Sequence, residues 1–270
     1  MGKYMKSTLK ILILFILFSI SNTFAQLEVS HEFGFTAGPV TMQTDYGERH
    51  HLPSSTPTSF GIAAVHYLNF YGSNYNWRNG ASFFSDHFKL KTELSYYFNN
   101  SLEHKGRYVA EGSLNSEADK LRAMKGKTKS FNIGTGLEFH FKNLEDYGLL
   151  FNDDIKFAPY IGAGLQFNMF DPELTSDLGD WTTNPDVLPE KWANDGVFVE
   201  KDNTFSLTLS AGTRYKLDSF DLVLDARWQY FFSNKYDGLD AKVSENKFND
   251  TLIFFSVGVV FDMETFAGGY

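Results

Sequence analysis

The stretch that decides the fold is residues 251–261, which read TLIFFSVGVVF. In an extended strand, alternate side chains point to opposite faces. One of these two faces is wholly apolar and consists of Ile253, Phe255, Val257, Val259 and Phe261. Such a strand invites aggregation unless something covers it, and a bilayer around a closed sheet is one such cover. The stretch therefore predicts the last strand of a membrane β-barrel.

Seven earlier segments show the same two-residue alternation, with one face apolar and the other small or polar. This period is the sequence signal of strands with two different faces. The eight predicted strands cover residues 27–38, 59–71, 87–98, 128–141, 157–170, 204–217, 222–232 and 251–261. We therefore predict an all-β fold, an eight-stranded antiparallel up-and-down transmembrane β-barrel over residues 26–261. A count of ten strands stays open as an alternative.

The connections between these strands alternate in length. Those after the first, third, fifth and seventh strands are long, and those after the second, fourth and sixth are shorter. Outer-membrane barrels place long loops outside the cell and short turns in the periplasm. We therefore expect long extracellular loops, with both ends of the barrel in the periplasm.

The first 25 residues resemble a secretory signal. Lys3, Lys6 and Lys10 precede or begin the apolar run Ile11–Phe18, and small residues lie before Gln26. The run is too short for a bilayer, which needs about 20 helical residues. We expect residues 1–25 to be a cleaved signal peptide, residues 262–270 to be a short tail, and the mature chain to reside in the outer membrane.

Composition excludes several classes of function. The chain has no cysteine, which excludes disulfides, thiol catalysis and thiolate metal sites. Its net charge is −9, and it falls to −12 without the three lysines of the first 25 residues. Such an acidic chain argues against nucleic acid as a partner. We expect no cofactor and no metal.

Charged residues fall on the predicted inner face of the barrel. An eight-stranded barrel has a lumen just wide enough for its own side chains, so these charges must be buried. The inward charges are Glu32, Lys89, Lys91, Glu93, Glu138, Arg214, Lys216, Asp225 and Arg227. Four acids face five bases, and an unpaired buried charge is costly. We predict a lumen ion-pair network, with a proton or ion relay as the alternative.

The extracellular half of the lumen instead receives small side chains. These are Gly34, Thr36, Gly61, Ala63, Asn132, Gly134, Ser206 and Thr208. They suggest a shallow cavity that a folded-in loop or a ligand fills.

The two largest loops differ in charge. Residues 171–203 carry nine acids and two lysines, whereas residues 99–127 carry six bases and four acids. Lysine and arginine bind phosphates well. We therefore consider Lys120, Arg122, Lys125 and Lys127 for contact with lipopolysaccharide, against the alternative that the two loops pair with each other. The carboxylates Asp171, Glu173, Asp177 and Asp180 match no established metal-binding spacing.

Histidines are the main candidates for catalysis and for protein contact. His50 and His51 lie in the first long loop, on the side where acyl chains of the outer leaflet would be cut. Ser85, Asp86 and His87 have the letters of a triad, but neighbours on a strand point to opposite faces. His31 and His66 lie on the lipid-facing side of adjacent strands. If Gly38 pairs with Ser59, these two histidines also pair, either in the headgroup zone or against another membrane protein.

The whole mature chain resembles small outer-membrane barrels of the OmpA, OmpX or OmpW type. Four segments are similar to a family of uncharacterised barrels from flavobacteria and their relatives, in the phylum Bacteroidota. They are DYGER at 45–49, HYLN at 66–69, DHFKL at 86–90 and KLRAM at 120–124. The resemblance implies a Gram-negative cell envelope and no specific activity. One departure is the tail after Phe261, because barrels of this class commonly end on an aromatic residue.

The sequence thus predicts a non-enzymatic outer-membrane barrel with a plugged lumen. It would act in envelope structure, in surface binding or as an accessory subunit of an export or assembly machine. The alternatives are a lipid A modifying acyl-chain enzyme and a narrow porin-like transporter of hydrophobic molecules. Expected partners are outer-membrane lipid, lipopolysaccharide and a second membrane protein.

Overall fold

The computed structural model describes residues 30–47, 59–70, 82–148, 156–193, 195–241, 243 and 248–263. The predicted signal peptide, His50 and His51 lie outside these residues, as does all but the start of the predicted tail. The described ranges include every strand of the barrel.

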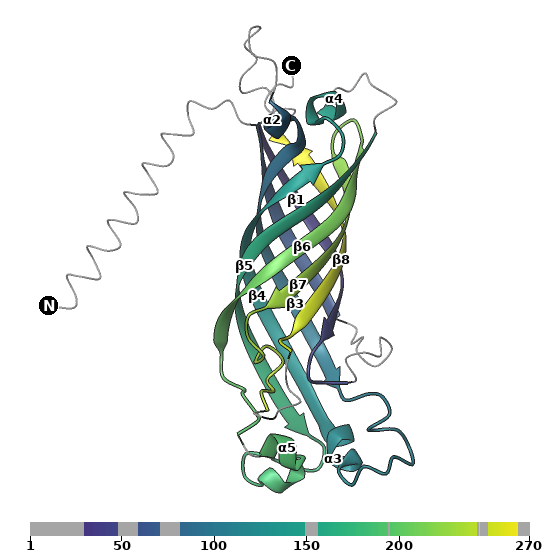
Figure 1. The fold of residues 1–270 in the computed structure, drawn as a ribbon, viewed down its shortest axis with the longest axis vertical. Helices are drawn as coiled ribbons and strands as arrows, with labels where there is room; N and C mark the ends of the chain where they lie inside the picture. Colours follow the sequence, from purple (N-terminus) through teal and green to yellow (C-terminus); the bar gives the residue numbers. More distant parts are fainter. Residues whose placement is uncertain are drawn as a thin grey trace, which may run out of the picture.

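Eight strands form one closed antiparallel barrel (Figure 1). They are β1 (Ser30–Gln43), β2 (Ser59–Asn69), β3 (Phe88–Glu103), β4 (Met124–His140), β5 (Phe157–Ser176), β6 (Asp202–Lys216), β7 (Asp221–Phe231) and β8 (Thr251–Asp262). Each strand pairs with the next in sequence, and β8 closes the sheet against β1, with Phe33 opposite Phe261. The predicted fold class is confirmed, and the closed sheet has eight strands and not ten.

The two-residue alternation of the sequence becomes an inside and an outside. Along β1, Phe33 and Phe35 are exposed, whereas Glu32 and its inward neighbours are buried in the lumen. Phe35 and Phe205 expose 65% and 57% of their surface. In a water-soluble protein, side chains of this kind are mostly buried in the core. Because the sheet has no free edge, backbone hydrogen bonds are satisfied around the whole circumference.

One end of the barrel, here called the turn end, carries three connections. They span residues 70–87 with helix α2 (Phe83–His87), residues 141–156 with helix α4 (Leu144–Gly148), and residues 217–220. The expected alternation in length fails in one place, since 70–87 is longer than the first loop, 44–58. The reason is that β1 continues to Gln43 and that Phe83–His87 form a helix before β3 begins.

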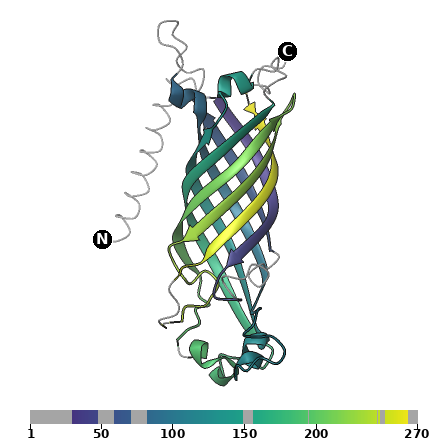
Figure 2. The same cartoon turned by 45° about the vertical axis from the view of Figure 1, so that its right-hand side comes forward.

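The opposite end, here called the loop end, is built on three strands that continue beyond the others (Figure 2). Pairing of β5 with β6 stops at Phe170 and Asp202, but pairing of β4 with β5 continues to Met124 and Ser176. The end of β3 joins this three-strand extension through Glu103 and Lys125. The sequence prediction had ended these strands at the barrel wall.

The rest of the loop end folds against this extension. Helix α3 (Ala118–Ala123) lies between β3 and β4, and the 3-10 helix η2 (Pro185–Val187) and helix α5 (Glu190–Ala193) lie between β5 and β6. Within the described residues, no helix is long and apolar enough to cross a membrane.

Candidate functional site

The lumen holds all nine charged residues that the sequence placed there. Toward the turn end, Glu32 is the centre of the network. Its two carboxylate oxygens pair with Lys89 Nζ and Arg214 Nη1, both at 2.6 Å, and it also accepts a hydrogen bond from Asn69 Nδ2 at 2.9 Å. Arg214 lies fully buried, 4.1 Å from the ring of Tyr67. The register of β1, β2, β3 and β6 therefore brings these groups together.

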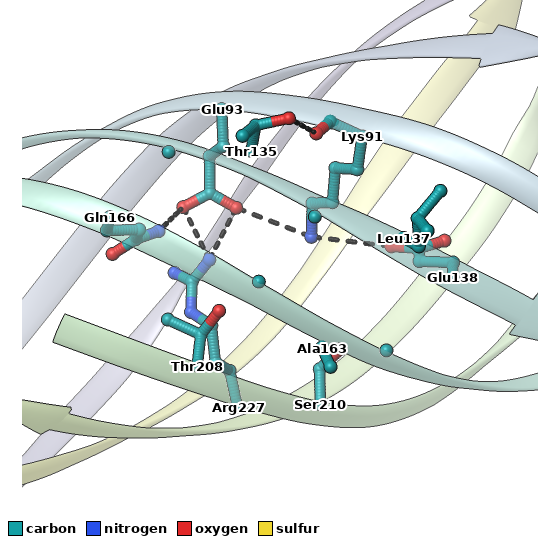
Figure 3. A pocket seen from close by; sticks show the side chains of 14 residues that line it. Lys91, Glu93, Thr135, Leu137, Glu138, Ala163, Gln166, Thr208, Ser210 and Arg227 are labelled. Atoms are coloured by element: carbon teal, nitrogen blue, oxygen red, sulfur yellow. Dashed lines mark hydrogen bonds and ion pairs between the residues drawn. The ribbon is translucent and has the colours of Figure 1, made fainter.

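A second group lies at mid-height (Figure 3). Arg227 Nη1 lies 2.5 Å from both oxygens of Glu93, and Gln166 Nε2 donates to the same carboxylate at 3.2 Å. Lys91 bridges Glu93 at 3.3 Å and Glu138 at 3.5 Å. The cavity between these side chains has about 30 Å³, which is room for about one water molecule. It is no channel.

Two lumen residues, Asp221 and Tyr160, were missed by sequence reasoning. Asp221 pairs with Lys216 at 3.4 Å and with Arg214 at 3.7 Å, and Tyr160 donates to Asp225 at 2.8 Å. Both were missed for the same reason, since each lies at or near a strand end where alternation is hard to read.

Hydrogen bonding in the turn half of the lumen is incomplete. Neither oxygen of Glu138, neither ring nitrogen of His140, nor Nε and Nη2 of Arg214 has a hydrogen-bond partner among the described residues. His140 Nε2 and Arg214 Nη2 lie 3.5 and 3.8 Å from Glu138, distances at which a water commonly bridges. Bridging water molecules would complete these hydrogen bonds.

The loop half of the lumen is filled by apolar side chains. This lumen plug consists of Val40, Met42, Ala63, Tyr97, Phe170, Phe231, Tyr236, Leu252 and Phe254. A Cβ on Gly61 would lie within 3.0 Å of Tyr97, Val40 and Phe254. At Gly61, the space that suggested a cavity is therefore taken by large side chains from other strands.

One member of the lumen plug comes from a loop. Tyr236 lies between β7 and β8, and its ring stacks on Phe231 with 4.0 Å between centroids. Its hydroxyl lies 2.6 Å from Ser130 Oγ, and its backbone oxygen accepts from Thr128 Oγ1 at 2.9 Å. Of the two occupants that the sequence suggested for the outer half, the structure has the folded-in loop.

Beyond the plug, all four loop-end connections meet in a second apolar core, here called the cap. It consists of Tyr46, Leu102, Met124, Leu174, Leu188, Trp192, Leu239 and Ala241. Nothing in the alternation of the strands signalled this core, because its members come from loops and strand ends.

The cap contains two buried titratable groups with shifted pKa values, His104 and Asp237. The ring of His104 lies 4.7 Å from that of Tyr46, and burial, together with the charge of Lys191, lowers the pKa of His104 to about 3. Asp237 is fully buried and accepts from the backbone N–H groups of Asp45 and Leu239. Burial and the Asp45 carboxylate raise the pKa of Asp237 well above its ordinary value.

The four basic residues considered for lipopolysaccharide separate into two groups. Lys120 donates to the backbone oxygen of Leu188, and Arg122 pairs with Asp119, so both serve the loops themselves. Lys125 and Lys127 lie exposed on the outer face of the three-strand extension.

The acidic and basic loops do pair in part. Lys125 of the basic loop lies 2.6 Å from Asp177 of the acidic loop, and Lys129, on β4, lies 3.4 Å from Glu173. The pair of Lys201 and Asp171, at 3.0 Å, lies within the acidic loop. No group of three potential metal ligands occurs within the described ranges.

The candidate triad is no triad, though for a different reason than expected. Ser85, Asp86 and His87 lie in helix α2 and not on a strand. Ser85 forms a capping box with Ser82, while His87 Nδ1 lies 2.8 Å from the backbone oxygen of His140.

His31 and His66 do contact each other, but not through the predicted register. Gly38 pairs with Gly61 and not with Ser59, so His31 lies opposite Leu68. The histidines meet diagonally, with 3.0 Å from His31 Nδ1 to His66 Nε2. A slip of two residues preserves the faces of a strand, which is why alternation could not exclude it.

No family model matches the chain, and a search of curated proteins finds no relative. Among solved structures, the chain is similar to Ail, the attachment invasion locus protein of Yersinia pestis, in complex with the heparin analogue sucrose octasulfate. That match has 13% identity, 87% of this chain and 97% of that chain covered, and a TM-score of 0.38.

It is also similar to a major outer membrane protein from Thermus thermophilus, with 11% identity, 86% and 99% coverage and a TM-score of 0.43. A third match is the outer membrane enzyme PagL, with 8% identity, 85% and 98% coverage and a TM-score of 0.36. The closed eight-stranded barrel itself agrees with the sequence resemblance to small outer-membrane barrels at the level of fold.

Proposed function

We propose that this chain is a non-enzymatic, non-conducting protein of the outer membrane whose loop end faces outward and presents a binding surface. The observation that carries the proposal is the cap. Four connections far apart in sequence converge on one apolar core around Trp192, which is 2% exposed. Loops that only needed to link strands would not require such a core, because loops ordinarily run over the surface.

The membrane location is supported by the wall. Large apolar side chains are exposed around the barrel, whereas charges are kept in the lumen. A bilayer is the solvent in which that distribution is stable. Fractionation of the host envelope tests it, and recovery of the chain as a water-soluble protein would contradict it.

The absence of conduction is supported by the lumen plug and the ion pairs behind it. We expect the purified barrel to give no single-channel events in a planar bilayer. A porin of known conductance is the control for the assay, and stable openings of the chain would overturn this part of the proposal.

For the ligand we propose phosphate groups of lipopolysaccharide, bound by the outer face of the three-strand extension. Lys125, Lys127 and Lys129 alternate on that face, immediately above Phe131 on the exposed wall. They would thus stand at the level of the headgroups, where lysine contacts phosphate as a point charge.

Charge reversal tests this ligand. The variant Lys127→Glu with Lys129→Glu should copurify with less lipopolysaccharide than the unchanged chain. Lys142→Glu is the matched control, because Lys142 is exposed at the turn end. Equal amounts in all three proteins would exclude this face, and a stable protein partner in a native pull-down would favour the accessory-subunit role instead.

No described residue favours the enzymatic alternative. The remaining suspects, His50 and His51, are tested directly: replacement of both by alanine should leave the lipid A mass spectrum unchanged. Loss or gain of an acyl chain in that spectrum would contradict the non-enzymatic role.

A further inference from the structure

The outer wall of the barrel carries an apolar furrow of about 620 Å³. Its floor is formed by small side chains, among them Ala64, Thr92 and Thr135. Its sides include the rings of Phe33, Phe35, Phe167 and Phe205. The furrow lies on the face that the proposed function places in the bilayer.

The register gives the furrow its direction. Phe35 on β1 is paired with Ala64 on β2. The row of directly paired residues continues from strand to strand as far as Phe205 on β6. Six strands at about 4.8 Å spacing make it roughly 24 Å long. Strands of such barrels tilt by about 35–45°, so the row climbs roughly 15 Å. That is one leaflet's share of the roughly 30 Å hydrocarbon core.

The furrow begins near the turn end and rises toward the loop end. Phe33 lies three residues after the start of β1 at the turn end, whereas Phe205 lies three residues after the start of β6 at the loop end. With the turn end in the periplasm, the furrow therefore starts in the periplasmic leaflet and rises toward the outer leaflet.

A chain of polar groups lies at its lower end. His66 Nδ1 is 3.1 Å from Thr92 Oγ1, and His66 Nε2 is 3.0 Å from His31 Nδ1. The two rings also stack, with 5.3 Å between centroids. Both nitrogens of His66 are therefore used, and the chain of hydrogen bonds ends at the exposed His31.

The remaining nitrogen of His31, Nε2, makes no hydrogen bond to the described residues. Polar groups at a lipid-facing wall are costly without a partner. In the tautomer with its hydrogen on Nε2, His31 accepts through Nδ1 from His66 and donates through Nε2 to an anion in the headgroup zone.

We propose that the furrow binds one phospholipid of the periplasmic leaflet, with its phosphate at His31 Nε2 and one acyl chain entering the row at Phe35 and Ala64. The occupant is a phospholipid because the site has a polar end followed by an apolar part, as a phospholipid has a headgroup followed by acyl chains. A hydrogen-bond donor lies at the turn end of the wall, and an apolar furrow rises from it toward the middle of the bilayer. The inference rests on the proposed membrane location and orientation.

Native mass spectrometry of the full-length mature chain, extracted in mild detergent and offered phosphatidylglycerol, tests the proposal. The unchanged chain should retain one phospholipid molecule. Ala64→Phe fills the floor of the furrow and should abolish that peak. Ala226→Phe makes the same change on the lipid-facing side of β7, away from the furrow, and should keep it.

The headgroup contact is tested separately. His31→Phe should lower retention of phosphatidylglycerol about tenfold, as for loss of one charge-assisted hydrogen bond. It should leave retention of diacylglycerol, which has no phosphate, unchanged. An equal loss of both lipids would overturn the phosphate contact.

Equal retention by the unchanged chain, Ala64→Phe and Ala226→Phe would show an ordinary lipid annulus and overturn the proposal. A second protein chain in place of the lipid would overturn it in favour of a protein interface. Heat-modifiable mobility on gels verifies that each variant is folded. Membrane fractionation of the same variants separates failure of the furrow from failure of the proposed location.

Discussion

Toward the turn end the lumen is crossed by charged side chains, whereas toward the loop end it is filled by rings and aliphatic groups. The charged half leaves buried polar atoms without direct partners among the described residues, and the apolar half is completed by one tyrosine from a loop. Bridging water therefore fits the first half, whereas the second half is closed by packed rings and aliphatic groups. The comparison shows that the lumen is blocked in two ways, by ion pairs in the turn half and by apolar packing in the loop half.

The two halves meet at Tyr97. Its ring packs in the lumen plug, and its hydroxyl accepts a hydrogen bond from Arg227 Nη2 at 2.6 Å. The guanidinium of Arg227 also lies 5.2 Å from the ring of Phe254, another member of the plug. Changes on either side of this junction should therefore separate the two kinds of closure.

The largest effect is expected in the charged half. Arg214→Met removes one of the two cationic partners of Glu32 and a neighbour of Asp221, so buried carboxylates lose compensation. Breaking a buried pair costs about 3–5 kcal/mol of unfolding free energy. Urea unfolding in lipid vesicles measures it. Lys216→Met is the control, because Lys216 is partly exposed at the rim, and an equal loss in both variants would show that burial does not set the cost.

A smaller effect is expected in the apolar half. Tyr236→Ala leaves a cavity in the lumen plug and should cost about 2–4 kcal/mol. Tyr236→Phe loses only the hydrogen bond with Ser130, about 1 kcal/mol. Planar-bilayer recordings of Tyr236→Ala should still show no steady openings, because the charged half stays closed. Steady conductance would mean that the plug alone closes the barrel.

The junction should give the next effect. Tyr97→Phe keeps the ring but removes the acceptor for Arg227, and a hydrogen bond to a charged group contributes about 1.5–3 kcal/mol. Tyr96→Phe is the matched control on the opposite face of the same strand and should change the unfolding free energy little. A neutral Tyr97→Phe would indicate that water replaces the lost oxygen.

The smallest effect concerns the cap and depends on pH. The folded pKa of His104 is about 3, below the ordinary value of about 6.5, so the unfolded cap binds the proton first. The contribution of His104 is therefore full above about pH 6.5 and falls as the pH drops toward 3. Protease sensitivity of the loops should rise over that window, and less so in His104→Phe.

The neighbouring carboxyl of Asp237 acts in the opposite sense. Its raised pKa makes its contribution full below the ordinary value of about 3.9, with loss as the pH rises above it. Acid sensitivity that is unchanged in His104→Phe would therefore assign the pH response of the cap to another group.

Strand positions could be predicted because alternation depends only on which solvent each face meets. The wall, the lumen charges and the strand count follow from that pattern alone. Register does not, as His31 and His66 show, because a two-residue slip keeps every side chain on its face. The plug was missed for a related reason, since small residues such as Gly61 reveal nothing about what faces them across the lumen.

The cap could not be predicted either, because loop contacts have no period. Tyr46 and Trp192 are 146 positions apart, and neither lies in a strand. Helix α2 was read as part of a strand because Phe88 and the residues after it alternate strongly and Ser85–His87 precede them directly.

The three-strand extension has a mechanical consequence. Beyond Phe170, β5 is hydrogen-bonded to β4 but no longer to β6, so a force on the far end would enter the wall through β3, β4 and β5 only. A force along the length of the three-strand extension acts on many backbone hydrogen bonds at once, so the extension resists it. A sideways force toward β6 would instead break the backbone hydrogen bonds between β5 and β6 one at a time, starting at Phe170 and Asp202. We expect this last pair to separate first under an external force.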